Sequence, residues 1–255
     1  MWGFCRSATV LLVSAMLPGV FLLAQQQKKP AASGPSGSSM SMPGMDMGDS
    51  NMDPTMAMSH RHMDMGPHMK MTPLRPLQPG DRQKADQIVA EARAAIEPYQ
   101  DYRVALADGY QIFLPNVKQP MYHFTKNWYA VEAAFHFNPD HPTSLLYEKA
   151  KDGYKLIGAM YTAPANTPLQ ELDSRVPLSI AQWHEHINFC QAPPGEARAY
   201  FGPHPKFGLR GSITTKEQCE AAGGKFRPQI FGWMVHVYPF EKTEQAVWSV
   251  ERQIQ

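Results

Sequence analysis

The pattern of apolar and polar positions divides the chain into three stretches. An apolar run, interrupted at Pro18 and Gly19, covers residues 8–23. The next stretch extends to residue 79, combines polar and small residues with many methionines, and shows no helical or strand period. From residue 80 onward, apolar residues recur first at helical and then at strand spacing. We therefore predict a signal peptide at 1–24, a disordered linker at 25–79 and one folded domain at 80–255.

The first stretch is typical of a secretory signal peptide, with Arg6 before the apolar run and the small residue Ala24 after it. The alternative is an uncleaved anchor helix. Pro18 and Gly19 argue against it, because they leave a stretch too short to cross roughly 30 Å of hydrocarbon. We predict cleavage near Ala24, a periplasmic or secreted location, and no membrane span in the mature chain.

Two helices are expected at the start of the folded domain. Pro79-Gly80-Asp81 opens the first, with Asp81 as its N-cap, and Pro98 ends it. The second, shorter helix runs from Tyr102 to Gly109.

Four segments with the composition of strands follow, which are rich in aromatic and aliphatic residues and mostly bounded by Pro, Gly or Asn. The segments are 145–147, 154–161, 183–189 and 231–238. A short helix interrupts them, with capping-box spacing at Thr214–Glu217 and a stop at Gly223-Gly224. The predicted fold is α+β, an antiparallel sheet with the N-terminal helical pair packed on it.

Charge and cysteine content limit the functions to consider. The formal net charge is +1 without a basic block, so a nucleic-acid partner is not expected.

Cleavage of the signal peptide would remove Cys5 and leave Cys190 and Cys219, which in an oxidising compartment favours a disulfide. The alternative is a thiolate metal ligand at Cys190, close after His184 and His186. The sequence contains no nucleophile elbow, phosphate loop, haem-attachment motif or dinucleotide fingerprint.

The linker contains a segment dense in methionine and histidine between residues 40 and 71. Its candidate metal ligands are Met40, Met42, Met45, Met47, Met52, Met56, Met58, His60, His62, Met63, Met65, His68, Met69 and Met71. Thioethers are soft ligands for Cu(I), and imidazole also accepts Cu(II). A core-filling role is excluded because the segment has no other large apolar residue. Scavenging of oxidants by methionine is the main rival to copper binding.

Two short stretches in this segment carry a resemblance to known proteins. Met42–Gly48 (Met-Pro-Gly-Met-Asp-Met-Gly) and His60–Gly66 (His-Arg-His-Met-Asp-Met-Gly) resemble the Met-rich repeats of periplasmic copper-resistance proteins and of some multicopper oxidases. This resemblance covers about 30 residues of low-complexity sequence. It implies copper handling by the segment and no homology of the folded domain.

In the folded domain, His184 and His186 would share one face of a strand because side chains alternate. The same alternation places His236 beside Met234 and Tyr238 on another strand. If the two strands pair, His184, His186 and His236 form a cluster suited to copper, zinc or non-haem iron. The alternative is a set of satisfied polar residues on a half-buried sheet.

Other side chains are second candidates for chemistry. Glu132 and His136 would share a helix face at i, i+4. For His123 we rank first a structural place in an aromatic cluster with Tyr122, Trp128 and Tyr129. Glu185 alternates to the face opposite His184. His141 and His204 lie in Pro-flanked loops and are expected to be solvated.

A second resemblance concerns the folded domain. Ala107–Tyr110, Met121–Phe124 and Pro142–Tyr161 are similar to segments of an uncharacterised group of secreted bacterial proteins. The resemblance implies one exported domain and no particular activity.

The leading expectation is an exported protein that binds or sequesters copper through the Met/His-rich segment, with a possible histidine site in the domain. One alternative is a small metal-dependent oxidase or hydrolase in which Glu185 or Glu132 acts as the base. Another is a structural or interaction domain without a metal.

Overall fold

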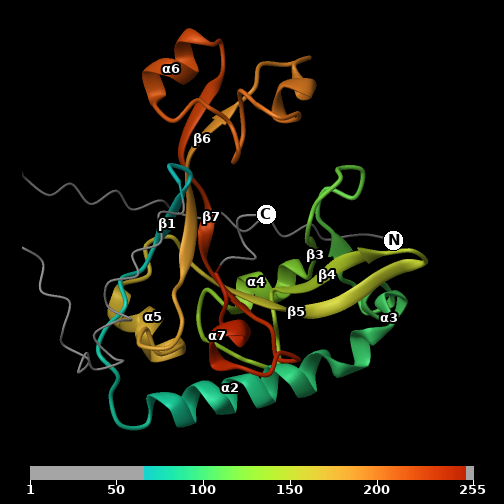
Figure 1. Cartoon of the computed structure of the whole chain (residues 1–255), viewed down its shortest axis with the longest axis vertical. Helices are drawn as coiled ribbons and strands as arrows, with labels where there is room; N and C mark the ends of the chain where they lie inside the picture. Colours follow the sequence, from blue (N-terminus) through green and yellow to red (C-terminus); the bar gives the residue numbers. More distant parts are fainter. Residues whose placement is uncertain (1–65, 251–255) are drawn as a thin grey trace, which may run out of the picture. The chain divides into compact units, whose positions relative to one another are not determined.

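The computed structural model describes residues 66–250, which fold around one seven-stranded antiparallel sheet (Figure 1). The strand order is β1-β6-β7-β5-β4-β3-β2. The strands are β1 (Met69–Met71), β2 (Gln111–Ile112), β3 (Tyr122–Thr125), β4 (Ser144–Ala150), β5 (Gly153–Ala163), β6 (His184–Gln191) and β7 (Lys225–Val237). The helices are α2 (Asp81–Ile96), α3 (Tyr102–Ala107), α4 (Asn127–Glu132), α5 (Leu169–Arg175), α6 (Lys216–Ala221) and α7 (Glu244–Val247), with 3-10 turns at Glu97–Gln100 and Ala197–Tyr200. The predicted α+β class is confirmed.

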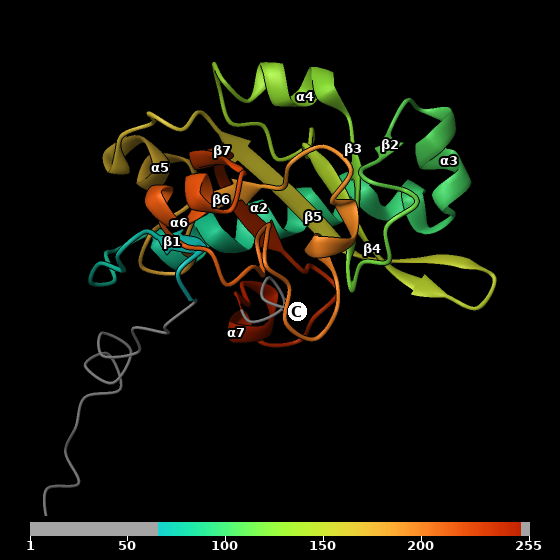
Figure 2. The same cartoon turned by 90° about the horizontal axis from the view of Figure 1, so that it is seen from above.

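One face of the sheet, here called the first face, packs against α2. The register places Phe124 opposite Leu145 on the neighbouring strand, and both are fully buried. The buried apolar residues of α2 recur three or four positions apart and are Ala85, Ile88, Ala92 and Ile96. In both views α2 runs beside β5 (Figures 1 and 2). The predicted helical pair on the sheet is therefore confirmed, and this layer is the main hydrophobic core.

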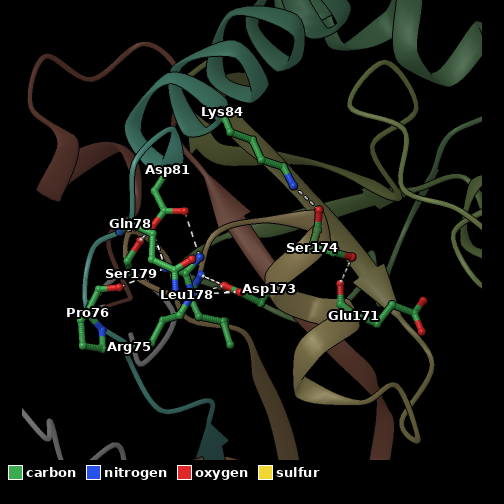
Figure 3. Close-up of polar contacts among 10 residues, drawn as sticks. All are labelled: Arg75, Pro76, Gln78, Asp81, Lys84, Glu171, Asp173, Ser174, Leu178 and Ser179. Carbon is green, nitrogen blue, oxygen red and sulfur yellow. Dashed lines mark hydrogen bonds and ion pairs between the residues drawn. The ribbon is translucent and has the colours of Figure 1, made fainter.

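An ion-pair network ties the start of α2 to α5 (Figure 3). The Arg75 guanidinium donates to Asp81 at 2.6 Å and to Asp173, in α5, at 2.8 Å. The Ser179 hydroxyl donates to the same Asp81 carboxylate at 2.6 Å. The hydrogen bonds from Arg75 hold the pKa of Asp81 well below its usual range, despite the opposing effect of burial.

This network explains a correction at the start of α2. Asp81 was predicted as the N-cap, but Gly80 takes that position with a left-handed φ of 89°. Asp81 is instead the first helical residue, because its carboxylate accepts from Arg75 and from the backbone N–H of Gln78 at 2.7 Å. A negative charge in the first helical turn remains favourable toward the helix dipole.

The four predicted strands are confirmed, and each overlaps one strand, namely β4, β5, β6 or β7, with Trp183 and Tyr238 lying just outside β6 and β7. Strand β7 begins six residues earlier than predicted, at Lys225, because its first half pairs with the outer end of β6. Strands β2 and β3 were not predicted. They have two and four residues, too few for alternation to be recognised.

The start of the folded domain is also earlier than predicted. The sequence placed residues 25–79 in a disordered linker, yet Met69–Met71 forms the edge strand β1. Beyond β1, the Thr72 backbone N–H donates to the Trp183 carbonyl at 2.8 Å. The three-residue alternation Met-Lys-Met is too short to distinguish from its low-complexity surroundings, and pairing with distant β6 stabilises it. The segment before residue 66 lies outside the described residues.

The outer ends of β6 and β7 lead to α6, at the top of Figure 1 and away from α2. The predicted helix is confirmed, and Thr215 caps it by accepting from the Gln218 N–H at 3.3 Å. Cys190 of β6 and Cys219 of α6 form the predicted disulfide, with Cα atoms 5.6 Å apart. Both cysteines are buried in a small cluster with Phe207. A Cys190 thiolate ligand is therefore excluded in this state.

Within residues 66–250, none of the helices has the length and apolar character needed to cross a bilayer.

Candidate metal centre

The opposite side of the sheet, here called the second face, carries imidazole and thioether side chains. Residues directly opposite each other on antiparallel strands project to the same face. The cross-strand pairs that join a methionine to a histidine are Met69–His186, Met71–His184, Met234–His184 and Met160–His236. This face therefore concentrates the two side-chain types that copper prefers.

Four imidazoles lie as neighbours across β3, β7 and β6, and together they are called the histidine row. Its members, in spatial order, are His123, His236, His184 and His186. Successive ring centres are 5.7, 5.1 and 5.5 Å apart. Two imidazoles that share one ion through metal–nitrogen bonds of about 2 Å have ring centres roughly 5–6 Å apart. Adjacent members of the row are therefore spaced as ligands of a common ion.

Burial keeps the row neutral. It holds the pKa values of His184 and His236 well below the usual range, and the neighbouring histidines lower them further. Burial also lowers the pKa of His123 to about 4 and that of His186 to about 4. Neutral imidazole is the form that binds a metal, because a protonated ring has no free lone pair.

Two nitrogen atoms at the centre of the row lack partners. Among the described residues, His184 Nδ1 and His236 Nε2 are buried and make no hydrogen bond. The other nitrogen of His236, Nδ1, lies 3.3 Å from the Tyr238 hydroxyl. Buried polar atoms in proteins are nearly always satisfied, so unpartnered nitrogens require an explanation. A metal bound by one imidazole nitrogen while the other is held by a polar neighbour supplies one.

The three histidines predicted to cluster lie in the row, but not around a single point. Within residues 66–250, no three or more His, Cys, Asp or Glu side chains converge closely enough to hold an ion. A bulge explains this arrangement. His184 pairs with Met234 and His186 with Ile230, so an advance of two residues along β6 corresponds to four residues along β7. At Gly232, inside the bulge, a side chain would collide with the carbonyl of Ala163. A metal centre here would combine two imidazoles with ligands of another type.

His123 was ranked first as part of an aromatic cluster, and that prediction is wrong. Strand β3 directs its neighbours Tyr122 and Phe124 into the first-face core, while the His123 ring contacts His236. Trp128 of α4 is 69% exposed and provides no cluster there. Because β3 is short, its alternation became visible only through its pairing with β4.

Glu185 does not face the row. It is paired with Lys70 at 2.7 Å, and the Lys70 ammonium lies over the Trp233 ring at 4.9 Å. The Gln229 side chain also donates to its carboxylate. Since its charge is neutralised there, Glu185 is not placed to act as a base on an ion bound at the row.

Glu132 and His136 form the predicted i, i+4 pair, with a carboxylate-to-Nε2 distance of 2.9 Å. His141 joins them, contrary to the expectation that it is solvated: its Nδ1 lies 2.8 Å from Glu132, and its ring stacks on Tyr129. Burial acts to raise the Glu132 pKa, but hydrogen bonds from His141 and Asn138 outweigh it, so the pKa is lowered. The Glu132 carboxylate is thereby held by His136, His141 and Asn138. His204 is exposed, as expected.

A shallow groove of about 410 Å³ lies elsewhere, between α2, α5 and residues 135–139. Its most buried charge, Arg175, is already used, because it donates to the Ala133 carbonyl at 2.7 Å and to Glu171 at 2.6 Å. The groove contains no member of the histidine row. The groove is therefore separate from the histidine row and gives no access to it.

Comparisons of the chain with protein-family models, curated proteins and solved structures found no significant match. The candidate site is therefore argued from its own residues.

Proposed function

We propose that this protein is an exported copper-binding protein that collects copper with its Met/His-rich segment and retains it at the histidine row. The observation that carries the proposal is the junction of these two parts. Met69 and Met71, the last methionines of the segment, form β1 and lie opposite His186 and His184. A metal captured by the segment is thereby delivered to the edge of the row.

The ligand chemistry favours copper over the other metals considered. Zinc and iron bind imidazole, but thioethers select for Cu(I). Methionine and histidine occur together both in the segment and on the second face. This recurrence also disfavours oxidant scavenging, which has no need of histidine.

Export agrees with the cysteine chemistry. A disulfide such as Cys190–Cys219 persists in oxidising compartments. The apolar run at 8–23, as a signal peptide, would export the chain to such a compartment. Thioethers and imidazoles remain available as ligands there, whereas thiols are oxidised.

The test is an anaerobic Cu(I) titration of the full exported chain against a chromophoric chelator. The parent should bind several equivalents. Replacing the nine methionines from Met40 to Met65, together with His60 and His62, by serine should reduce binding to about one equivalent. This segment-replaced chain should keep the Tm of the parent, since the sheet formed by the described residues 66–250 contains none of the substituted positions.

A matched control changes charge instead of sulfur in the same segment. Its four aspartates, replaced by asparagine, are Asp46, Asp49, Asp53 and Asp64. Copper stoichiometry should be unchanged in this control. The proposal fails if the parent binds no copper, or if removing the methionines and histidines leaves the stoichiometry intact.

A further inference from the structure

We infer that the second face binds one Cu(I) ion in a mixed imidazole–thioether site at the centre of the histidine row. The assigned ligands are His184, His236, Met160 and Met234. This inference rests on the proposed copper-binding function, and it adds a ligand set and an oxidation state.

The sheet register brings the four side chains into one patch. Met160 of β5 lies opposite His236 of β7, and Met234 of β7 lies opposite His184 of β6. Directly opposite residues have Cβ atoms about 4.5–5.5 Å apart on the same face. The two β7 positions, 234 and 236, are separated by one residue and therefore also share this face. Three adjacent strands thus supply two nitrogen and two sulfur ligands.

Both imidazoles of this patch have an unpartnered nitrogen. The ring centres of His184 and His236 are 5.1 Å apart, the shortest spacing in the row. Their free atoms are His184 Nδ1 and His236 Nε2, both buried. The Tyr238 hydroxyl donates to the Met121 sulfur at 3.6 Å, which leaves its oxygen to accept from His236 Nδ1 at 3.3 Å. The hydroxyl thereby fixes the orientation of the His236 ring.

The surroundings favour a monovalent, soft ion. Met160 and Met234 are each only 6% exposed, in a cluster with Leu146. Besides burial, the groups that lower the pKa of His236 are the other histidines of the row, with no carboxylate among them. Four neutral ligands leave a dication uncompensated in a poorly solvated site, which is costly. Cu(I) carries one charge and prefers thioethers, so it fits this site best.

Thioethers also explain why His, Cys, Asp and Glu alone form no convergent group. The described residues contain no three such side chains around a point, but methionine sulfur does not belong to that set. Two imidazoles and two thioethers complete a four-coordinate site without a third histidine. His123 and His186 then flank it at the two ends of the row.

The experiment uses the segment-replaced full chain, so that the remaining copper reports on the folded domain. Met160→Leu and Met234→Leu each remove a sulfur at nearly constant volume, which preserves packing. Either change should weaken Cu(I) by at least the roughly 10–100-fold that outer-shell changes already cause in metal sites. X-ray absorption of the Cu(I)-loaded chain should show sulfur and nitrogen scatterers, with sulfur reduced in either variant.

Leu146→Ile is the matched control, because it changes the shape of a side chain in the same buried cluster at a position that makes no contact assigned to the site. It should leave Cu(I) affinity unchanged. An equal loss in Leu146→Ile would overturn the ligand assignment by showing that packing causes the effect.

The remaining outcomes separate this inference from the proposed function. If His184→Leu and His236→Leu abolish binding while both methionine variants bind normally, the site is purely imidazole and the mixed site is overturned. If the segment-replaced chain binds no copper although the parent does, the site is overturned and the segment alone carries the function. If the parent itself binds none, the proposed function fails as well.

Discussion

The two faces of the sheet are built by the same strands and serve different ends. On the first face, Trp183 and Val235 are buried among apolar residues against the helices. One position further along each strand, His184 and His236 turn imidazoles to the second face. The first face leaves the Trp183 indole N–H as an unsatisfied donor, whereas the second leaves two ring nitrogens unsatisfied and adjacent. The proposed metal ion would satisfy the two ring nitrogens, whereas an N–H donor such as that of Trp183 cannot bind a cation.

The contrast shows that alternate residues of one strand can have different roles. Those on the first face stabilise the fold, and those on the second face include the proposed metal ligands. Apolar area removed from water stabilises the fold in proportion to that area. Buried imidazole nitrogens without partners cost free energy in the metal-free protein, and a bound ion would recover it. We therefore expect substitutions on the two faces to have opposite consequences for stability and for copper.

The largest expected effect is on the first face. Trp183→Ala should lower the free energy of unfolding by about 3–5 kcal/mol, because it removes a large side chain with 0% exposure. Urea denaturation measures the change. Trp128→Ala, at a position 69% exposed, is the control and should stay within about 0.5 kcal/mol of the parent. Equal effects of the two substitutions would show that the first face is not the stabilising core.

An intermediate effect is expected where α2 is anchored. Asp81→Asn should cost about 1–3 kcal/mol, since it weakens hydrogen bonds from the charged Arg75. The Asp81 pKa is depressed in the fold, so its contribution is present above the ordinary value of about 4 and is lost as pH falls below it. Asparagine at this position should flatten that acid limb in urea titrations.

The control for this anchor is Asp101→Asn, an exposed carboxylate paired with Arg103 two residues away. Its effect on stability should be much smaller, and copper affinity should be unaffected in both variants. If Asp81→Asn weakens copper binding, the anchor and the second face are coupled, and the separation of the two faces is wrong.

The smallest effect on stability is expected at the row itself. In metal-free protein, His236→Leu should change the free energy of unfolding by less than about 1 kcal/mol, or raise it, because an unsatisfied buried nitrogen is replaced by an apolar group. The neighbouring residue Val235 lies on the first face, so Val235→Ala should instead lower the free energy of unfolding by about 1–3 kcal/mol. A loss of several kcal/mol for His236→Leu would mean that the row is a structural polar cluster.

Sequence periodicity predicted those parts of the fold that are long enough to show a period. Helix α2 and strands β4–β7 are each seven or more residues long, which is enough for a period to be recognised. Strand β1 has three residues and exists because β6 pairs with it. No local pattern distinguishes such a strand from the low-complexity segment that precedes it.

The candidate site was predictable to the same extent. Alternation along β6 and β7 placed His184, His186 and His236 on one side of their strands. It could not provide the register, which brings Met160 opposite His236 and carries His123 to the end of the row. Nor could it show the bulge around Gly232, which spaces His186 away from the centre and leaves methionine as the complementary ligand.

The most direct test of copper retention is the number of Cu(I) ions that the segment-replaced full chain keeps after anaerobic desalting. We predict one ion per chain, and none in the same chain carrying His184→Leu and His236→Leu with an undiminished Tm. An ion that survives both substitutions would contradict the assignment of copper to the histidine row. A segment-replaced chain that never holds an ion would contradict it equally.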